Sequence, residues 1–291
     1  MIYTIENEAL KVQISDRGAE LWSIQTRDGN EYLWQGDETY WADRAMNLFP
    51  YIARLTEGKY VLDGKTYEMT IHGFANYSTF SVAKQEKDHI VFELTDSEET
   101  GKMYPYAFAF RVDFSLGQNK LLVKYEVENR SDGVMYFGVG GHPGFNVPME
   151  KGLKFEDYYL EFDKAENPVR VGFTETCFLN GEDKEYALSE GGKILMNHNL
   201  FDEDAIVLRD MAKSVTLKSD KSDRYVKVEY PEMDYLGIWH MPCTDAPYVC
   251  IEPWSSLPSR QDVIEDLAKK EDLIALEGGK VYENTWTIEI G

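Results

Sequence analysis

The chain has 291 residues, of which 43% are hydrophobic and 28% charged, as is ordinary for a soluble globular protein. Its 52 acidic and 30 basic residues give a formal net charge of −22. A surface with this charge repels phosphate backbones and anionic lipids, so we expect no nucleic-acid partner and no membrane association.

The cysteines and the N-terminus indicate a compartment for the protein. Cys177, Cys243 and Cys250 form an odd set without CxxC spacing, which argues against a disulfide framework and a zinc knuckle. Residues 1–8 are acidic and lack the apolar core of a signal peptide. These features predict a cytoplasmic protein.

The N-terminal part of the chain reads as strands and hairpins. Apolar residues alternate with polar ones over residues 2–14, and a turn at Asp28-Gly29-Asn30 leads to another apolar segment at 32–34. Residues 60–67 place Asp63-Gly64 between apolar flanks, which predicts a two-residue hairpin turn whose backbone needs positive φ.

The clearest strands are residues 106–116 and 121–128, joined by Gly-Gln-Asn-Lys as a hairpin. Each has a period of two, and we expect each to bury one face. Shorter strands are predicted at 90–94, 134–139, 158–162, 206–208, 214–218, 225–230, 235–239, 248–251 and 285–290. The pattern predicts one all-β domain over 1–291, built from packed antiparallel sheets.

One helix is expected, at residues 260–269. Ser259 is a candidate N-cap, and Val263, Ile264 and Leu267 form a narrow apolar stripe at helical spacing. The sequence contains no internal repeat, linker or low-complexity segment.

Residues 140–148, Gly-Gly-His-Pro-Gly-Phe-Asn-Val-Pro, form the most unusual segment. Three glycines and two prolines predict a shaped loop, since proline removes a backbone donor and glycine allows unusual dihedrals. The glycines would leave room for a ligand beside His142. On this segment alone, His142 is either a proton-transfer group or a hydrogen-bonded histidine in a rigid turn.

Three further segments place polar groups among apolar ones. Arg54 ends an apolar run that should be buried, so its guanidinium needs either a core carboxylate or a ligand oxygen. His72 directly precedes a glycine, and His142 lies two residues before one. Glu252 ends an apolar strand before Pro-Trp, where burial would raise its pKa toward the range of a useful base.

These residues predict general acid/base chemistry. The five histidines show no zinc-motif spacing, so no metal is expected, and no G-x-S-x-G or phosphate-binding G-x-x-x-x-G-K is present. Aromatic faces with polar groups at their rim suit a sugar, and four tryptophans are available: Trp34, Trp41, Trp239 and Trp254. We assign Trp239 to substrate binding.

The segments around Arg54, His72, His142 and Glu252, in that order, resemble the aldose 1-epimerase (galactose mutarotase-like) family, and most of all its LacX-type branch. The resemblance implies a large β-sandwich with a few short helices, a concave sugar-binding face and no cofactor. It implies that Glu252 is the base on the anomeric hydroxyl and that His142 is the acid on the ring oxygen.

The resemblance also implies that Arg54, His72 and an aspartate hold substrate oxygens. Asp204 is our choice for that aspartate because it directly precedes an apolar strand, with Asp202 as the alternative. The chain differs from the galactose enzymes in having Ala-Arg in place of Asn-Arg, so the sugar need not be galactose.

The expected activity is the interconversion of the α and β anomers of a hexose, with a small-molecule sugar as the partner. Three alternatives stay open at this point. The substrate could be a hexose 6-phosphate, for which Arg44, Arg54 and Lys59 are candidate ligands. Glu252 and Asp204 could instead hydrolyse a glycoside, or the chain could be a non-catalytic sugar-binding protein. The sequence is compatible with a monomer or a homodimer.

Overall fold

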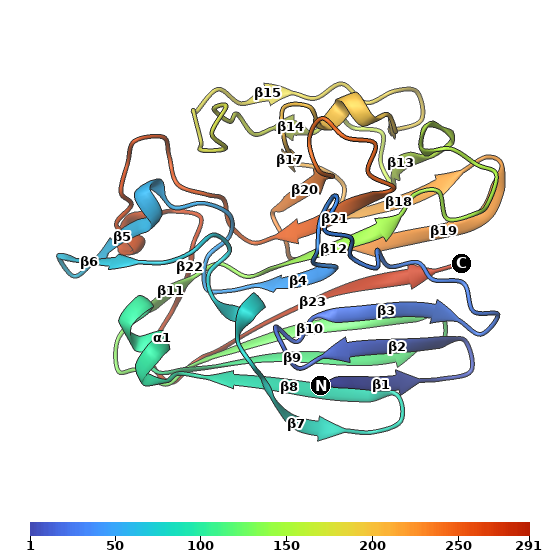
Figure 1. Cartoon of the computed structure of the whole chain (residues 1–291). Coiled ribbons are helices and arrows are strands. Elements are labelled where there is room, and N and C mark those ends of the chain that lie inside the picture. Colours follow the sequence, from blue (N-terminus) through green and yellow to red (C-terminus); the bar gives the residue numbers. More distant parts are fainter.

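Strands dominate the structure, a computed structural model that describes all residues from 1 to 291 (Figure 1). Every strand pair is antiparallel. A nine-stranded and a seven-stranded sheet form the body of the molecule. The predicted all-β class with large antiparallel sheets is confirmed.

The nine-stranded sheet forms one layer. Its strands, in spatial order, are β16 (Lys193–Leu195), β13 (Tyr159–Phe162), β18 (Ser214–Ser219), β19 (Ser222–Glu229), β23 (Val281–Ile290), β10 (Lys120–Asn129), β9 (Phe108–Gly117), β8 (His89–Thr95) and β7 (Ser81–Gln85).

The seven-stranded sheet forms the other large layer. Its order is β15 (Lys184–Glu185), β14 (Val169–Arg170), β17 (Ile206–Arg209), β20 (Tyr235–Trp239), β21 (Tyr248–Trp254), β12 (Gly140–Asn146) and β4 (Ala45–Leu48).

Three small sheets and a few short helices complete the fold. The small sheets are β1 (Ile2–Glu6), β2 (Leu10–Ser15) and β3 (Leu21–Thr26); β5 (Lys59–Leu62) and β6 (Lys65–Glu68); and β11 (Met135–Phe137) and β22 (Ile274–Leu276). The helices are α1 (Glu98–Met103) and the 3-10 turns η1 (Thr56–Gly58), η2 (Ala75–Tyr77), η3 (Phe155–Asp157), η4 (His198–Phe201) and η5 (Leu267–Lys269). None of them is long and apolar enough to cross a membrane.

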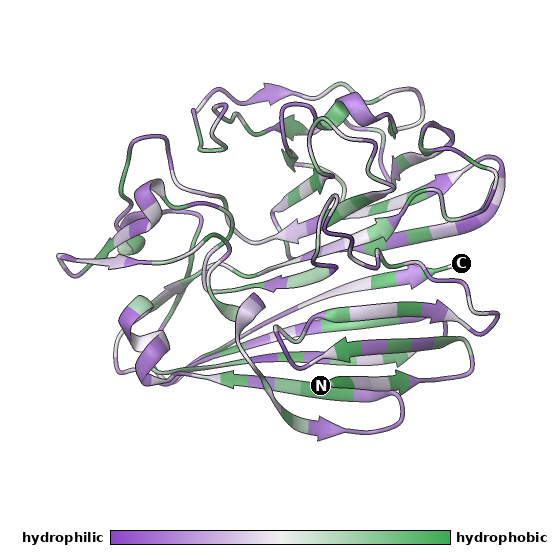
Figure 2. Cartoon of the chain, in the orientation of Figure 1, coloured by the Kyte–Doolittle hydropathy of each residue, from purple (hydrophilic) through white to green (hydrophobic).

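The two clearest predicted strands are present as β9 and β10, and their alternation sets the core. Their apolar positions are buried while the intervening polar residues stay partly exposed, and Figure 2 shows the matching change of hydropathy along these strands. The predicted hairpin at 60–67 is also present: it joins β5 to β6, and Asp63 and Gly64 both have positive φ.

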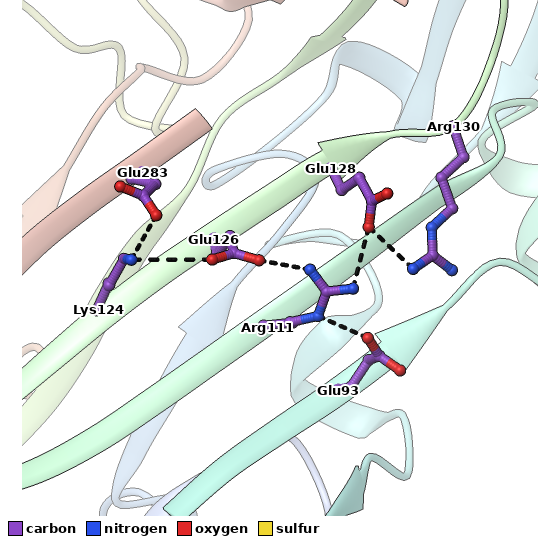
Figure 3. Close-up of polar contacts among 7 residues, drawn as sticks. All are labelled: Glu93, Arg111, Lys124, Glu126, Glu128, Arg130 and Glu283. Carbon is purple, nitrogen blue, oxygen red and sulfur yellow. Dashed lines mark hydrogen bonds and ion pairs between the residues drawn. The ribbon is translucent and has the colours of Figure 1, made fainter. Parts of the chain in front are cut away.

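The polar face of the nine-stranded sheet carries a network of ion pairs (Figure 3). Arg111 on β9 contacts Glu93 on β8 at 2.6 Å and Glu128 on β10 at 3.0 Å, and it also pairs with Glu126. Because like charges opposite one another on a sheet repel, Arg111 allows three carboxylates to share one face. Partly exposed ion pairs of this kind contribute little individually.

The opposite face of the nine-stranded sheet packs against the seven-stranded sheet. The Tyr125 hydroxyl on β10 donates a 2.9 Å hydrogen bond to the Asn47 side chain on β4, and both residues are buried. The indole of Trp286 on β23 lies directly beneath Gly141 of β12. These contacts fix how the two large sheets sit on each other.

The prediction of a loop at 140–148 is wrong, because residues 140–146 form strand β12 inside the sheet. A Cβ atom on Gly141 would come within 2.6 Å of Trp286, and one on Gly144 within 3.1 Å of Trp41. The glycines therefore make room for two indoles, one on each face of the strand, and not for a ligand.

The predicted helix at 260–269 is also wrong, since only the single turn η5 forms there. Glu265 is buried and accepts hydrogen bonds from both the backbone and the guanidinium of Arg260, which folds the segment around this pair. Asp262 has positive φ, and Ile264 is exposed, so the apolar stripe has no surface to pack on.

Replacing Gly141 with alanine should destabilise the protein by about 1–3 kcal/mol, because the new methyl group overlaps the Trp286 ring. Urea denaturation measures the loss. Gly133→Ala is the matched control, since a Cβ atom there meets nothing within 4 Å. Equal stability of the two variants would contradict the packing described for β12.

Candidate functional site

The register between β12 and β21 places His142 opposite Glu252. Gly140 pairs with Trp254 and Gly144 pairs with Cys250, so the residues midway between these pairs face each other. Directly opposed residues in an antiparallel pair project from the same face with neighbouring Cβ atoms. Two segments more than one hundred residues apart in sequence thus meet at a fixed point of the sheet.

The two side chains touch without a hydrogen bond. His142 Nε2 lies 3.2 Å from Glu252 Oε2, and the exposed fractions of the side chains are 9% and 2%. Glu252 Oε2 and His142 Nδ1 nevertheless have no hydrogen-bond partner. The geometry therefore leaves both groups available to a third molecule.

Burial shifts the pKa of each member of this pair toward its neutral form. Loss of solvent, followed by the charge of Asp204, raises the pKa of Glu252 well above its usual value of 4.5. Loss of solvent, followed by the neighbouring His72, lowers the pKa of His142 well below 6.5. Transfer of one proton from the carboxyl of Glu252 to the imidazole of His142 would give a base and an acid in contact.

The pair lies in a row of cross-strand neighbours that forms the floor of a cavity. On either side of His142 and Glu252 the row includes Met46 of β4, Gly237 of β20 and Val207 of β17. The cavity, which we call the site cavity, encloses about 420 Å³ and is lined mainly by apolar side chains. Pockets of this kind with a few convergent polar groups are typical of small-molecule sites.

All six residues predicted for the site line the site cavity: Arg54, His72, His142, Asp204, Trp239 and Glu252. They come from β12, β20, β21 and from three loops. The structure therefore brings the whole predicted set together, and their individual roles stay predictions.

His72 is held in a defined tautomer. Its Nδ1 accepts a 3.1 Å hydrogen bond from the backbone N–H of Ala53, so the ring proton belongs on Nε2. Burial, with the adjacent charge of Arg54, lowers the pKa of His72 to about 4. The ring is thus a neutral donor, and it meets His142 edge to face with ring centroids 5.6 Å apart.

Asp204 lies on the wall of the site cavity beside a cysteine. The Cys177 thiol donates to Asp204 Oδ2 at 2.9 Å, and the backbone N–H of Ala205 donates to Oδ1 at 2.8 Å. Each carboxylate oxygen keeps lone pairs for a ligand. Asp202, the alternative, does not line the site cavity.

Arg54 is exposed, so the expectation of a buried guanidinium is wrong. It lies at the rim of the site cavity and has no carboxylate within ion-pair distance, because the apolar run that precedes it ends in a loop at the cavity edge. The guanidinium therefore has no core carboxylate as its partner and is free for a ligand oxygen.

Three tryptophans line the site cavity. Trp41 lies 4.8 Å from the His142 ring and meets Trp239 edge to face at 5.7 Å, measured between ring centroids, and Trp254 is buried beside Glu252. Trp34 is not among the lining residues, because it is buried against Tyr248 beneath the site.

Only one of the three candidate phosphate ligands lines the site cavity. The guanidinium of Arg44 lies over the Trp22 ring and donates to the Trp22 carbonyl, and Lys59 pairs with Glu57. Arg54 remains.

The site also offers one set of potential metal ligands. Atoms of His142, Cys250 and Glu252 lie within 4.8 Å of one another. Burial, followed by the charge of Glu252, raises the pKa of the Cys250 thiol well above its usual value, so the thiolate that a metal needs is disfavoured. This donor set fits a metal poorly.

The sequence does not predict Cys177 as a site residue. It offers Trp41 and Trp254 as available tryptophans, without a predicted role in substrate binding. Cys177 and Trp41 lie in loops, and no local pattern places either beside β12 or Asp204. For the two tryptophans, the aromatic content of the sequence is the one indication, since an aromatic-lined sugar site needs more than one indole.

Comparison with known proteins gives a consistent result. A family model described as Aldose 1-epimerase matches residues 1–288. The plasmid-encoded protein LacX of Lactococcus lactis subsp. lactis is 31% identical, over 96% of this chain and 97% of its own.

Solved structures are similar over the whole chain. A galactose mutarotase related enzyme from Lactobacillus acidophilus is 37% identical, with a TM-score of 0.93 over 100% of this chain and 97% of its own. A galactose mutarotase-like protein from Lactobacillus casei ATCC 334 is 31% identical, with a TM-score of 0.94 and complete coverage of both chains.

Iodoacetamide near pH 8 should modify Cys243 and spare Cys177, as read by mass spectrometry. Cys243 is exposed, whereas burial, together with the hydrogen bond to Asp204, raises the pKa of the Cys177 thiol to about 12. Asp204→Asn removes the acceptor carboxylate and should speed the modification of Cys177. Equal rates at the two cysteines of the unaltered protein would contradict the thiol–carboxylate contact.

Glu252→Gln should raise the melting temperature, and by more near pH 8 than near pH 5. Between pH 4.5 and the raised pKa of Glu252, the native state holds a proton that the unfolded chain has lost, so stability falls as pH rises. The amide lacks this dependence, and we expect a difference of roughly 2 °C or more between the two pH values.

Glu265→Gln is the matched control, because Glu265 is buried too. Burial raises its pKa, but the hydrogen bonds and charge of Arg260 outweigh this and lower the pKa below 4.5. This carboxylate therefore stabilises the protein above that pH, and Glu265→Gln should lower the melting temperature at both pH values. A loss of stability in Glu252→Gln that grew with pH would contradict the environment described for Glu252.

Proposed function

The chain belongs to the aldose 1-epimerase family, and on that premise we propose that it is an active epimerase that interconverts the α and β anomers of a hexose. The observation that carries the proposal is the approach of His142 to Glu252 at 3.2 Å inside an aromatic-lined cavity. A buried acid and base in contact support ring opening and closure. Glu252 Oε2 and His142 Nδ1 have no hydrogen-bond partner in the protein.

In the proposed reaction, Glu252 removes the proton from O1 of the α-anomer while His142 gives a proton to the ring oxygen O5. The electron pair of the O1–H bond forms the C1=O1 double bond, and the C1–O5 bond breaks. The aldehyde turns about C1–C2. His142 then takes back the O5 proton and Glu252 returns one to O1, which closes the ring as the β-anomer and leaves the enzyme unchanged.

The remaining residues would hold the sugar during this turn. The Nε2–H of His72 and the guanidinium of Arg54 are donors for hydroxyl oxygens, and the Asp204 carboxylate is an acceptor. The indoles of Trp41 and Trp239 would cover the C–H face of the ring and exclude water. These positions restrain the sugar while leaving C1 free.

The charges around the site cavity favour a neutral hexose over a hexose 6-phosphate. The carboxylates of Glu203 and Asp204 line it, whereas Arg54 is its only cationic side chain. A dianionic phosphate would meet carboxylates at the wall, at a distance where like charges repel. The intact His142–Glu252 pair likewise favours an enzyme over a non-catalytic sugar-binding protein.

Polarimetry of freshly dissolved α-glucose and α-galactose should show mutarotation faster than in buffer. Glu252→Gln and His142→Asn should each lower kcat by about 10²–10⁴-fold, since each removes one positioned proton-transfer group. Trp239→Phe should instead act mainly on KM. No acceleration with either hexose or their 6-phosphates would refute the proposal, and saturable binding without acceleration would support the non-catalytic alternative.

A further inference from the structure

The floor of the site cavity contains a polar atom that the proposed reaction does not use. Trp254 follows Glu252 by two residues on β21, so both side chains project from the same face of the strand. Its indole Nε1–H is buried and has no hydrogen-bond partner, and the residue is only 4% exposed. Glu252 Oε2 has no partner either. A buried donor and a buried acceptor are thus both unsatisfied on neighbouring side chains of the cavity floor.

Two glycines on the flanking strands determine where the indole lies. A Cβ atom on Gly140 of β12 would come within 3.0 Å of Trp254 Cδ1, and one on Gly237 of β20 within 3.1 Å of Trp254 Cζ2. These two carbons stand on either side of Nε1 along the rim of the indole. The edge that carries the N–H therefore packs against the sheet between the two glycines.

Gly237 also brings this edge to the carboxyl group of Glu252, its cross-strand partner. The same Cβ position on Gly237 would lie 3.2 Å from Glu252 Cβ and 3.4 Å from the carboxyl carbon. The indole edge and the carboxyl group are thus neighbours over one glycine. Burial, followed by the charge of Asp204, raises the pKa of Glu252, whereas the hydrogen-bonding effect of the Trp254 indole lowers it. The N–H therefore lies near the carboxyl group without completing a hydrogen bond to Oε2.

The proposed reaction needs a donor at this place. Glu252 must be ionised when it takes the proton from O1, and a carboxylate without solvent is unstable unless a donor stabilises its charge. An indole N–H is a donor only, so it can stabilise the carboxylate without competing for the transferred proton. The titratable groups that face Glu252 are His142 of β12, Asp204 of the cavity wall, and Tyr248 and Cys250 of β21.

We propose that Trp254 is a positioning residue for the base: its indole N–H donates to the Glu252 carboxylate while that group is ionised and orients it toward O1 of the sugar. The hydrogen bond forms when the carboxyl loses its proton and weakens when the proton returns, so the indole itself gains and loses nothing. This inference rests on the proposed function and adds a residue to it. The alternative is that Trp254 only fills the cavity floor, where a phenyl ring would serve as well.

Trp254→Phe tests the proposal, because it keeps an aromatic ring on the floor and removes the N–H. The acidic limb of the pH profile of kcat/KM reports the ionisation of the base. Loss of the donor disfavours the carboxylate, so the midpoint of this limb should move to higher pH by about one unit, the effect of one hydrogen bond to a charged group. At a fixed pH on the limb kcat/KM should fall about tenfold, with a much smaller change on the plateau above it.

Trp286→Phe is the matched control. Nε1 of Trp286 is also buried without a partner, but this indole lies beneath Gly141, on the face of β12 that points away from the cavity. The midpoint of the acidic limb should be the same in Trp286→Phe as in the unaltered protein. An unmoved midpoint in Trp254→Phe, or equal shifts in the two variants, would overturn the positioning role.

A second measurement needs neither sugar nor activity. The chain has 6 tryptophans, so labelling them with the heavy nitrogen isotope gives few indole N–H signals in the NMR spectrum. One of these signals should move downfield as pH rises through the ionisation of Glu252. It should be missing in Trp254→Phe, and it should lose its pH dependence in Glu252→Gln.

This measurement separates the inference from the proposed function. A titrating Trp254 signal in a protein that interconverts no aldose would support the hydrogen bond and refute only the proposed activity. If no indole signal loses a pH-dependent shift in Glu252→Gln, the contact between Trp254 and Glu252 is refuted, whether or not the protein is an active epimerase.

Discussion

The pairing of β12 with β21 is the constraint on which the rest of the site depends. A shift of this register by one residue would turn His142 toward the core and bring Gly141 to the cavity. The core prevents such a shift, because Trp286 fills the space that only a glycine at 141 leaves open. Packing between the two large sheets therefore fixes the position of the candidate acid relative to the candidate base.

The same sheet explains why these two groups have unusual chemistry. Both residues are buried, and each lies on a strand of the seven-stranded sheet that is paired on both sides. Prolines next to each of them, Pro143 and Pro253, carry no backbone N–H that could have hydrogen-bonded there. Desolvation without local hydrogen bonds raises the pKa of Glu252 and lowers that of His142, and burying these two groups costs stability that an apolar core residue would not cost.

Much of this architecture follows from the sequence. The alternation in β9 and β10 and the Asp63-Gly64 turn are local signals, and each predicts its structure because strand period and turn chemistry act over a few residues. The four segments around Arg54, His72, His142 and Glu252 predict a shared site through their resemblance, in that order, to a known family, and all four residues line the site cavity.

The failures share one physical origin. Glycine and proline in β12 look like loop residues until Trp286 and Trp41, from distant parts of the chain, occupy the space that they leave. The apolar residues at 263 and 264 look helical until the Arg260–Glu265 pair bends the segment. Cys177 becomes part of the site only through its hydrogen bond to Asp204, 27 residues along the chain. In each case a partner far along the chain, or a buried pair, overrides the local preference.

Four residues of the site cavity have backbones in the left-handed region: Ala53, His72, Cys177 and Asp204. All four belong to loops, whereas His142 and Glu252 belong to strands. The sheet thus forms the floor of the cavity. The wall depends on individual loop residues whose backbones adopt a conformation that is uncommon for residues other than glycine. Evolution could exchange those wall residues one at a time, and so change which sugar is held, without disturbing the groups that would open its ring.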